Sequence, residues 1–230
     1  MINVKEVLST ELARLEENKT YKYETPLESA QAGVVRVRGK NVVMLASNNY
    51  LGLSDHPVVK KAAIEGTKKY GYGVASVRFL CGTQTIHFQL EKKISKFLGT
   101  EDTILYSSCF SANEGFFASL TNEKLGFENY KDVIYSDRLN HASIIDGQRL
   151  CRAEVVDKKI YGHRDVKELE KILEEDKSKD YRFRIIATDG VFSMEGDLAP
   201  LPELIELAQK YGAMLHEYVV DASLQRLPGP

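Results

Sequence analysis

The stretch of sequence with the most evident chemistry is a group of small residues at positions 107–109 (Ser-Ser-Cys), followed by Phe110. It follows an apolar run, residues 103–106, that reads as a buried strand, and it precedes a helix expected over residues 114–120. Free backbone amides at a helix N-terminus bind anions, because the helix dipole carries about half a positive charge there. The stretch therefore predicts a phosphate site, with plain capping of the helix by the serines as the alternative.

Two further groups of polar side chains follow other predicted strands. His141 comes after the apolar run around Ile134, and Asp189 and Ser193 come after the run around Ile186. In an open α/β sheet, ligands bind beyond the carboxyl ends of the strands, so we expect these side chains in one crevice with the phosphate site. Each group also has a plainer interpretation, because a lone histidine is often structural and an Asp beside glycines often only forms a turn.

Two segments nearer the N-terminus also hold residues suited to ligand binding. Residues 71–83 contain three glycines, which let a backbone approach a ligand closely, although the segment does not follow a strand as a dinucleotide motif does. Residues 46–53 contain Asn48 and Asn49, whose amides can bind a carboxylate or simply form turns. Neither segment alone distinguishes a binding site from a loop.

Together these groups predict a phosphate-bearing ligand held in an α/β crevice, with His141 and a carboxylate nearby. A thiol enzyme is the competing interpretation, because a helix N-terminus activates a thiol and Cys109 stands at one. The three cysteines of the chain form no C-x-x-C pair, so neither a disulfide framework nor a zinc ribbon is expected, and no metal site is predicted.

The elements that must position these groups alternate between helices and strands from Pro57 onward. Helices are expected over residues 57–70, 85–98, 166–173 and 201–211, and strands over residues 132–135, 153–156 and 185–187. Strands that alternate with helices imply crossover connections between parallel neighbours. The predicted fold class is α/β, with a mostly parallel sheet covered by helices on both faces.

The N-terminal part has a different pattern. Apolar residues recur at helical spacing over residues 4–15, and Asn3 and Glu6 have the spacing of a capping box. Alternation across residues 34–45 predicts a hairpin that turns at residues 39–41. We therefore expect an N-terminal helix and hairpin segment over residues 1–45, a large domain over residues 46–215 and a divergent tail over residues 216–230.

Composition limits the classes of function. The 230 residues are 43% apolar and 28% charged, with 31 Lys and Arg against 33 Asp and Glu. No basic field is available to bind a phosphate backbone, which argues against nucleic acid as a partner. No apolar run reaches the ~20 residues of a membrane span, and the first residues lack the apolar core of a secretion signal. A cytoplasmic protein with no membrane partner is expected.

Five stretches together resemble the α-oxoamine synthases, pyridoxal-phosphate enzymes of fold-type I that condense an amino acid with an acyl-CoA. They are SNNYLGLSDHP (47–57), GYGVASVRFLCGTQTIHFQLE (71–91), ILYSSCFSANEGFF (104–117), SDRLNHASIIDGQRLC (136–151) and IATDGVFSMEGDLAPL (186–201). The motifs SVRFLCGTQ and LNHASIIDG are most similar to those of the glycine C-acetyltransferase branch, which condenses glycine with acetyl-CoA to give 2-amino-3-oxobutyrate. The 8-amino-7-oxononanoate synthase branch, which serves biotin synthesis, is the alternative.

The resemblance assigns a place to the pyridoxal phosphate. It implies that the backbone at Cys109 and Phe110 holds the cofactor phosphate. The His141 ring is implied to stack on the pyridine ring and to orient the substrate as the catalytic histidine, and Ser193 to lie near the ring oxygen. The pyridine ring then stabilises a carbanion of glycine, which attacks acetyl-CoA.

The resemblance also concerns the substrates and the assembly. Asn48 matches the asparagine associated with the substrate carboxylate, and Ser76 lies in the stretch near the acyl-CoA and the partner subunit. Family members build their sites across a homodimer interface, so a homodimer is implied here as well.

The sequence departs from the family pattern after residue 215. Where the family continues to Val-Asp-Asp-Ala-His, this chain ends its corresponding run in Val-Val-Asp-Ala-Ser. Aligned on Asp-Ala, the aspartate that pairs with the pyridine nitrogen becomes Val220, and Asp221 takes that role only if the register shifts. The family's Schiff-base lysine belongs to a segment later than Pro230. We therefore expect a truncated form with little activity alone, or else a non-catalytic dimerisation partner or a gene fragment.

Overall fold

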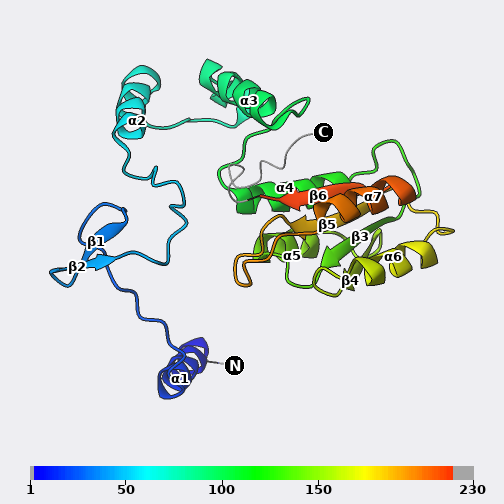
Figure 1. Cartoon of the computed structure of the whole chain (residues 1–230), viewed down its shortest axis with the longest axis horizontal. Coiled ribbons are helices and arrows are strands. Elements are labelled where there is room, and N and C mark those ends of the chain that lie inside the picture. The colour runs from blue at the N-terminus through cyan, green and yellow to red at the C-terminus, as the bar shows by residue number, and fades with distance from the viewer. Residues whose placement is uncertain (1–2, 220–230) are drawn as a thin grey trace. The chain divides into compact units, whose positions relative to one another are not determined.

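In the computed structural model, which describes residues 3–219, the chain forms two compact units. The first unit ends at Thr83 and the second begins at Gln84. Figure 1 labels the helices α1 to α7 and the strands β1 to β6. The domain boundaries predicted after residues 45 and 215 stay predictions.

The first unit is a series of short elements. They are α1 (Val4–Glu17), the antiparallel pair β1 (Val34–Val37) and β2 (Lys40–Val43), α2 (Pro57–Tyr70) and the π-helical turn η1 (Arg78–Gly82). The predicted N-terminal helix, the hairpin and the helix from Pro57 are confirmed. The hairpin turns at Arg38 and Gly39, both at positive φ, and not at residues 39–41 as predicted, because Lys40 already pairs with Val37.

The start of α1 differs from the predicted capping box. Asn3 is the N-cap residue, but its side chain makes no capping hydrogen bond, and only its carbonyl accepts, from the Val7 amide. The predicted exchange of side-chain hydrogen bonds between Asn3 and Glu6 is therefore wrong. No described residue of α1 is buried, so water can satisfy the first amides of this helix.

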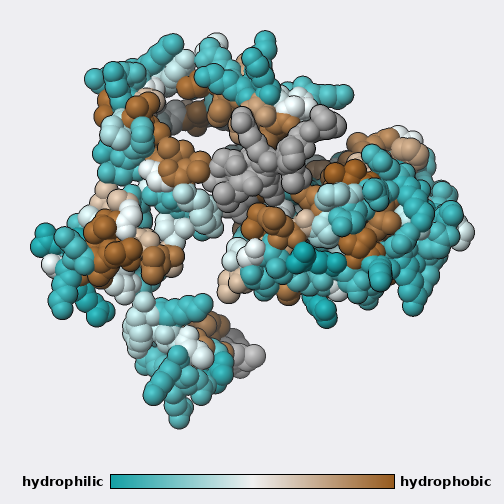
Figure 2. Space-filling model, in the orientation of Figure 1, coloured by the Kyte–Doolittle hydropathy of each residue, from teal (hydrophilic) through white to brown (hydrophobic). Residues whose placement is uncertain are grey.

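Apolar side chains remain on the surface of the first unit. Figure 2 shows apolar residues gathered over the region of β1 and β2, where Val43 is 68% exposed. Val35 is the one apolar side chain that is buried among the described residues of this unit. Across residues 3–219, no helix is both long and apolar enough to cross a membrane.

The second unit is built on a parallel sheet of four strands. These are β3 (Asp132–Asp137), β4 (Val156–Tyr161), β5 (Arg184–Asp189) and β6 (Met214–Tyr218), in the order β4-β3-β5-β6. Ile134 pairs with Ile185 at the centre, and β3 is buried along its whole length. Parallel strands joined by helices confirm the predicted α/β class.

Helices cover both faces of this sheet (Figure 1). They are α4 (Cys109–Asn122), α5 (Ala142–Arg149), α6 (Val166–Glu175) and α7 (Leu201–Tyr211), and α3 (Thr85–Leu98) precedes them in the chain. One hydrophobic cluster holds Ile134 with Phe117 of α4 and Ile144 of α5, and the other holds Tyr135 with residues of α6 and α7. Successive strand residues point to opposite faces, which is why Ile134 and Tyr135 divide between the clusters.

The strand predicted over residues 103–106 is wrong. This segment joins no ladder within the described structure, and Ile104 is 72% exposed. An apolar run becomes a strand only where a neighbouring strand satisfies its backbone groups. Helix α4 begins at Cys109, five positions before the predicted start at residue 114, because Ser108 caps it.

The edge of the sheet also differs from the prediction. Strand β4 spans Val156–Tyr161, whereas the sequence predicts residues 153–156. The polar residues Asp157 to Lys159 interrupt the apolar pattern from which a strand is predicted. They are tolerated because β4 is an edge strand. The hydrophobic pattern does not predict α5 either, since that helix is short and half of its residues are polar.

Candidate functional site

The carboxyl ends of the parallel strands bring polar side chains to one edge of the second unit. Asp137 ends β3, Asp189 ends β5 and Tyr218 ends β6, and Asp189 and Tyr218 are partners in register. His141 follows β3 directly and is the N-cap residue of α5. This edge is where open α/β sheets bind ligands.

His141 is held at this edge through both its backbone and its ring. Its backbone N–H donates to the two carboxylate oxygens of Asp189, at 3.2 and 3.1 Å. Its Nδ1 accepts from the Ser143 amide at 3.2 Å and lies 2.7 Å from Ser143 Oγ. The fold therefore fixes the orientation of the imidazole and brings it together with Asp189, as the strand-end argument predicts.

Asp189 is a buried carboxylate with a perturbed pKa. Burial raises the pKa of Asp189 to about 6, against the hydrogen bond from the His141 backbone, and the charge of Asp137 adds to the rise. The Asp189 amide donates to Asn140 Oδ1 at 2.9 Å, and Asn140 Nδ2 donates to the Ala187 carbonyl at 2.8 Å. These bonds fasten the turn that carries His141 to the end of β5.

A chain of hydrogen bonds runs from His141 to β6. Asn113 Nδ2 donates to Ser143 Oγ at 2.7 Å, and His216 Nε2 lies 3.0 Å from Asn113 Oδ1. Because Asn113 Oδ1 can only accept, His216 Nε2 is the donor. Because His141 Nδ1 accepts from the Ser143 amide, this nitrogen carries no proton, and the Ser143 O–H is the donor toward it. In a neutral His141 this order leaves the ring proton on Nε2.

His216 was not predicted as a functional residue. Its ring stacks on Phe116 with centroids 4.4 Å apart and contacts the edge of Phe117 at 4.8 Å. Partial burial against these rings lowers the pKa of His216 to about 4, so the ring is neutral at pH 7 and available as a donor. No signal in the sequence marks it, because it lies in the segment that departs from the family pattern.

The N-terminus of α4 has the features of the predicted phosphate site. Ser108 caps the helix, with its Oγ accepting from the Ser111 amide at 3.1 Å. The amides of Cys109 and Phe110 are the first two of the helix and point out of its N-terminus. The Phe110 ring lies edge-on to the His141 ring with centroids 6.4 Å apart. The helix terminus and the histidine therefore share one edge of the unit.

The thiol-enzyme alternative stays a prediction. Cys109 is exposed at the first position of α4. Ser143 uses Nδ1 of His141, so a thiol paired with this imidazole would have to face Nε2.

Tyr218 lies between these groups and was not predicted either. Its ring stacks on the His141 ring, with centroids 4.9 Å apart and planes 24° from parallel. Burial raises the pKa of Tyr218, and the charges of Cys109 and Asp189 raise it further. The phenol thus lies against the His141 ring, at the strand end that is in register with Asp189.

A second histidine, His163, fastens the loop after β5. Its ring nitrogens lie 3.1 Å from Asp137 Oδ1 and 3.2 Å from Asp197 Oδ2. Burial disfavours the imidazolium, but the hydrogen bonds to both carboxylates outweigh it and raise the pKa of His163. The ring also contacts Phe192 edge-on at 4.4 Å. Ser193 follows Phe192 in an exposed turn, and its role toward a cofactor stays a prediction.

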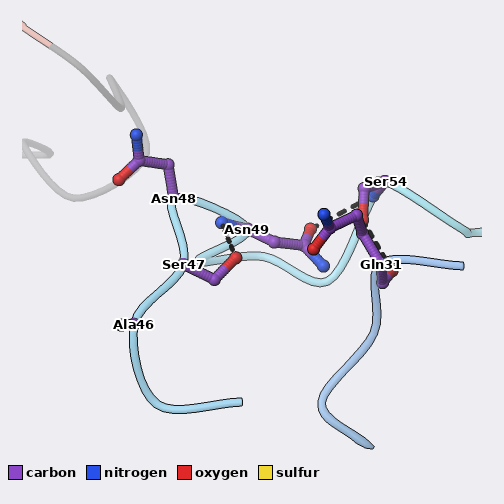
Figure 3. Close-up of a pocket in the computed structure, with 6 residues that line it drawn as sticks. All are labelled: Gln31, Ala46, Ser47, Asn48, Asn49 and Ser54. Atoms are coloured by element: carbon purple, nitrogen blue, oxygen red, sulfur yellow. Dashed lines mark hydrogen bonds between the residues drawn. The ribbon is translucent and has the colours of Figure 1, made fainter. Parts of the chain in front are cut away.

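The predicted substrate residues belong to the first unit. Asn48 lies in a shallow hollow lined by Gln31, Ser47, Asn49 and Ser54. Figure 3 shows the Asn48 side chain pointing away from the hydrogen bonds that join the others, and the Tyr50 hydroxyl donates to Asn48 Oδ1 at 3.4 Å. The carboxamide is thus on the surface, and its substrate role stays a prediction.

Ser76 is half-buried, and its role toward the acyl-CoA also stays a prediction. A Cβ placed on Gly82 would lie 2.0 Å from the Ser76 carbonyl oxygen, so the close turn around η1 requires glycine there. The other predicted site residue, Asp221, lies outside the described residues.

Comparison with known proteins shows matches over most of the chain. A model of the aminotransferase class I and II family matches residues 40–220. The 8-amino-7-oxononanoate synthase 1 of Bacillus velezensis is 45% identical over 210 residues, which are 91% of this chain and 51% of that protein. The mitochondrial 2-amino-3-ketobutyrate coenzyme A ligase of Bos taurus is 46% identical over 211 residues, 91% of this chain and 48% of that protein.

Solved structures give the same result for the fold. Serine palmitoyltransferase from S. paucimobilis, determined with a bound PLP-myriocin aldimine, superposes with a TM-score of 0.79 at 28% identity, over 91% of this chain and 50% of that one. An acetylornithine aminotransferase from Elizabethkingia anophelis, at 17% identity and a TM-score of 0.61, shares the fold. The chain spans about half the length of the relatives that it matches.

Proposed function

Because the chain belongs to the aminotransferase class I and II family, we propose that it carries the phosphate- and ring-binding part of a pyridoxal-phosphate-dependent acyltransferase. Its relatives are acyltransferases of the α-oxoamine synthase family, and that family depends on pyridoxal phosphate. The observation that supports the proposal best is the position of the α4 N-terminus beside His141 at the carboxyl edge of the sheet.

The phosphate end of the cofactor fits the residues present. Ser108 satisfies the Ser111 amide, which leaves the amides of Cys109 and Phe110 directed outward at the positive end of α4. The ring end fits the imidazole only after a change, since Tyr218 already stacks on His141. Cys109 and Phe110 would therefore hold the phosphate, and His141 would hold the ring.

When bound, the cofactor supplies a pyridine ring that stabilises negative charge at the α-carbon of an amino acid. The protein supplies orientation and a fixed tautomer of the neutral imidazole. Ser143 and Asn113 keep the proton of His141 on Nε2, and Asp189 anchors the His141 backbone. Asn48 is proposed to bind the substrate carboxylate, Ser76 to lie near the acyl-CoA, and Ser193 to lie near the ring oxygen.

We propose glycine and acetyl-CoA as the substrates of the complete enzyme, with 2-amino-3-oxobutyrate as the product. The sequences at residues 76–84 and 139–147 support this choice, as does the 46% identity to the Bos taurus ligase. The 45% identity to the Bacillus velezensis protein favours 8-amino-7-oxononanoate synthase as the second candidate. Release of free thiol from acetyl-CoA with glycine, against pimeloyl-CoA with alanine, separates the two. A preference for the second pair would contradict the proposal.

A matched pair of substitutions at Cys109 tests the phosphate site. Proline is tolerated at the first position of a helix, so Cys109→Pro removes one outward amide and keeps the fold, and Ser108 already has the extended backbone that precedes proline. Cys109→Ala removes the thiol and keeps the amide. We expect only Cys109→Pro to weaken binding of pyridoxine 5′-phosphate. An equal loss of catalytic activity in both variants, which both lack the thiol, would instead favour a thiol enzyme.

A homodimer in a cytoplasmic setting is part of the proposal. Apolar side chains of α1 and of the hairpin are exposed in the described structure. Exposed apolar surface of this kind favours contact with a partner subunit. A non-catalytic dimerisation partner is the alternative. Light scattering of the pure chain, alone and mixed with an intact relative, distinguishes self-association from association with the relative only.

A further inference from the structure

The aromatic pair of His141 and Tyr218 has a consequence beyond the proposed function. The two rings lie 4.9 Å apart and 24° from parallel, within the geometry of attractive aromatic pairs. The Tyr218 backbone is fixed, because its carbonyl accepts from the Gly190 amide at 2.9 Å and the residue pairs in register with Asp189. Ser143 holds the His141 ring at Nδ1, so the rings separate by rotation of the Tyr218 side chain.

We propose that Tyr218 blocks the aromatic face of His141, so that a ligand carrying both a phosphate and an aromatic ring binds only after the Tyr218 ring swings away. The inference rests on the proposed function, because the ligand is the cofactor proposed there. Its basis is placement: the phenol stacks on the His141 ring, and Tyr218 pairs in register with Asp189 at the carboxyl edge of the sheet.

The phosphate end of the proposed cofactor site is not blocked in the same way. Cys109 is exposed, and Phe110 is 37% exposed beside it. A small anion can therefore reach the α4 amides without disturbing Tyr218. The proposal thus predicts that Tyr218 affects the affinity for an aromatic phosphate and leaves the affinity for inorganic phosphate unchanged.

Titration calorimetry with pyridoxine 5′-phosphate tests this directly. This compound lacks the aldehyde of pyridoxal phosphate and cannot react with surface lysines. We expect Tyr218→Ala to bind it about tenfold more tightly than the unchanged chain, a factor that corresponds to about 1.4 kcal/mol and to the upper range of one aromatic pair. Tyr218→Phe keeps the stacked ring and should bind like the unchanged chain. Inorganic phosphate should bind all three alike.

The outcomes distinguish this inference from the proposed function. Equal affinity for pyridoxine 5′-phosphate in all three proteins, or weaker binding by Tyr218→Ala, overturns the block by Tyr218 and leaves the cofactor site in place. No binding by any of the three overturns the inference and the cofactor proposal together. Thermal melting of each variant checks that the second unit is folded.

A fluorescent variant gives a second readout that does not depend on affinity. The sequence contains no tryptophan, so Tyr218→Trp places a single indole on His141. If the ring must leave, saturating pyridoxine 5′-phosphate shifts the emission to longer wavelength as the indole enters water, and inorganic phosphate does not. Unchanged emission at saturation overturns the inference.

Discussion

The two units of the molecule bury their apolar side chains to very different extents. Phe117 and Ile134 in the second unit are 0% exposed, whereas Val4 and Leu8 of α1 are 66% and 58% exposed. The apolar spacing in the sequence is regular in both regions. Spacing therefore specifies which helix forms, and it does not specify whether the same chain covers the apolar face of that helix.

The difference also concerns charged pairs. In the second unit, Arg182 and Asp132 form an ion pair whose side chains are 3% and 0% exposed. In the first unit, Lys60 and Asp55 are at a similar distance, but their side chains are 55% and 40% exposed. The second unit thus depends on its own contacts for stability, and its substitutions should be costly where equivalent changes in the first unit are not.

The largest expected contrast is between two apolar truncations. Phe117→Ala should destabilise the second unit by about 3–5 kcal/mol, because it leaves a cavity in a closed core. Leu8→Ala removes an exposed side chain and should change stability by less than about 0.5 kcal/mol. Urea unfolding followed by circular dichroism measures both. A large cost for Leu8→Ala would show that α1 is covered in solution, and light scattering would then identify a second copy as the cover.

The ion pairs sharpen the same comparison. Arg182→Ala should cost about 3–5 kcal/mol, because it leaves the carboxylate of Asp132 buried and unpaired and removes the Arg182 contact with the Tyr130 ring at 3.7 Å. Lys60→Ala should cost less than about 1 kcal/mol, since water screens its pair with Asp55. If Arg182→Ala and Lys60→Ala lower the free energy of unfolding in urea equally, the two ion pairs do not differ in burial.

A third contrast lies within the second unit and depends on pH. Asp189 has a folded pKa of about 6, above the ordinary 3.8, so its contribution to stability is present at low pH and is lost as pH rises from about 4 to 6. His216 has a folded pKa of about 4, below the ordinary 6.5, so its contribution is present above 6.5 and is lost as pH falls toward 4. The two slopes oppose each other, and each represents on the order of 1–3 kcal/mol.

Single substitutions should therefore reveal each slope separately. Relative to the unchanged chain, Asp189→Asn should lose stability more steeply on acidification from pH 6.5 to 4, because the contribution of His216 then stands alone. His216→Phe should instead gain stability over that range, because only Asp189 remains. Melting temperatures at several pH values test both. Parallel pH profiles for the two variants would contradict the burial of these groups.

Much of the fold could be predicted from local pattern. Helix α2 begins at Pro57 and α7 ends before Gly212 at positive φ, where proline and glycine have direct conformational effects. The strand prediction at residues 103–106 was wrong, because a strand forms only beside a neighbouring strand, and the sequence of these residues does not show whether one is present. The range predicted for β4 was also wrong, because β4 is an edge strand with polar residues, and its place in the sheet decides how far it is buried.

The site was predictable where it depends on strand ends and unpredictable where it depends on distant pairs. His141 follows from the rule that ligands gather at the carboxyl ends of parallel strands. The α4 N-terminus follows only from the residues that begin the helix, because no strand precedes it in the described structure. His216 contacts Asn113 from 103 positions away, and Tyr218 reaches His141 across the sheet, so neither carries a local signal. Both also lie where the sequence departs from the family pattern, so the resemblance to the family did not predict them either.

The smallest expected contrast concerns the two helix starts. Ser108 caps α4 with a side-chain hydrogen bond, so Ser108→Ala should cost about 1 kcal/mol and speed hydrogen exchange of the Ser111 amide. Asn3 makes no such bond at α1, so Asn3→Ala should leave exchange in α1 unchanged. Faster exchange in α1 after Asn3→Ala would show a cap that forms in solution. Because both residues are favoured N-cap types, only the structure distinguishes them, and a difference between the variants would confirm that α4 has a fixed start beside His141 while α1 does not depend on its cap.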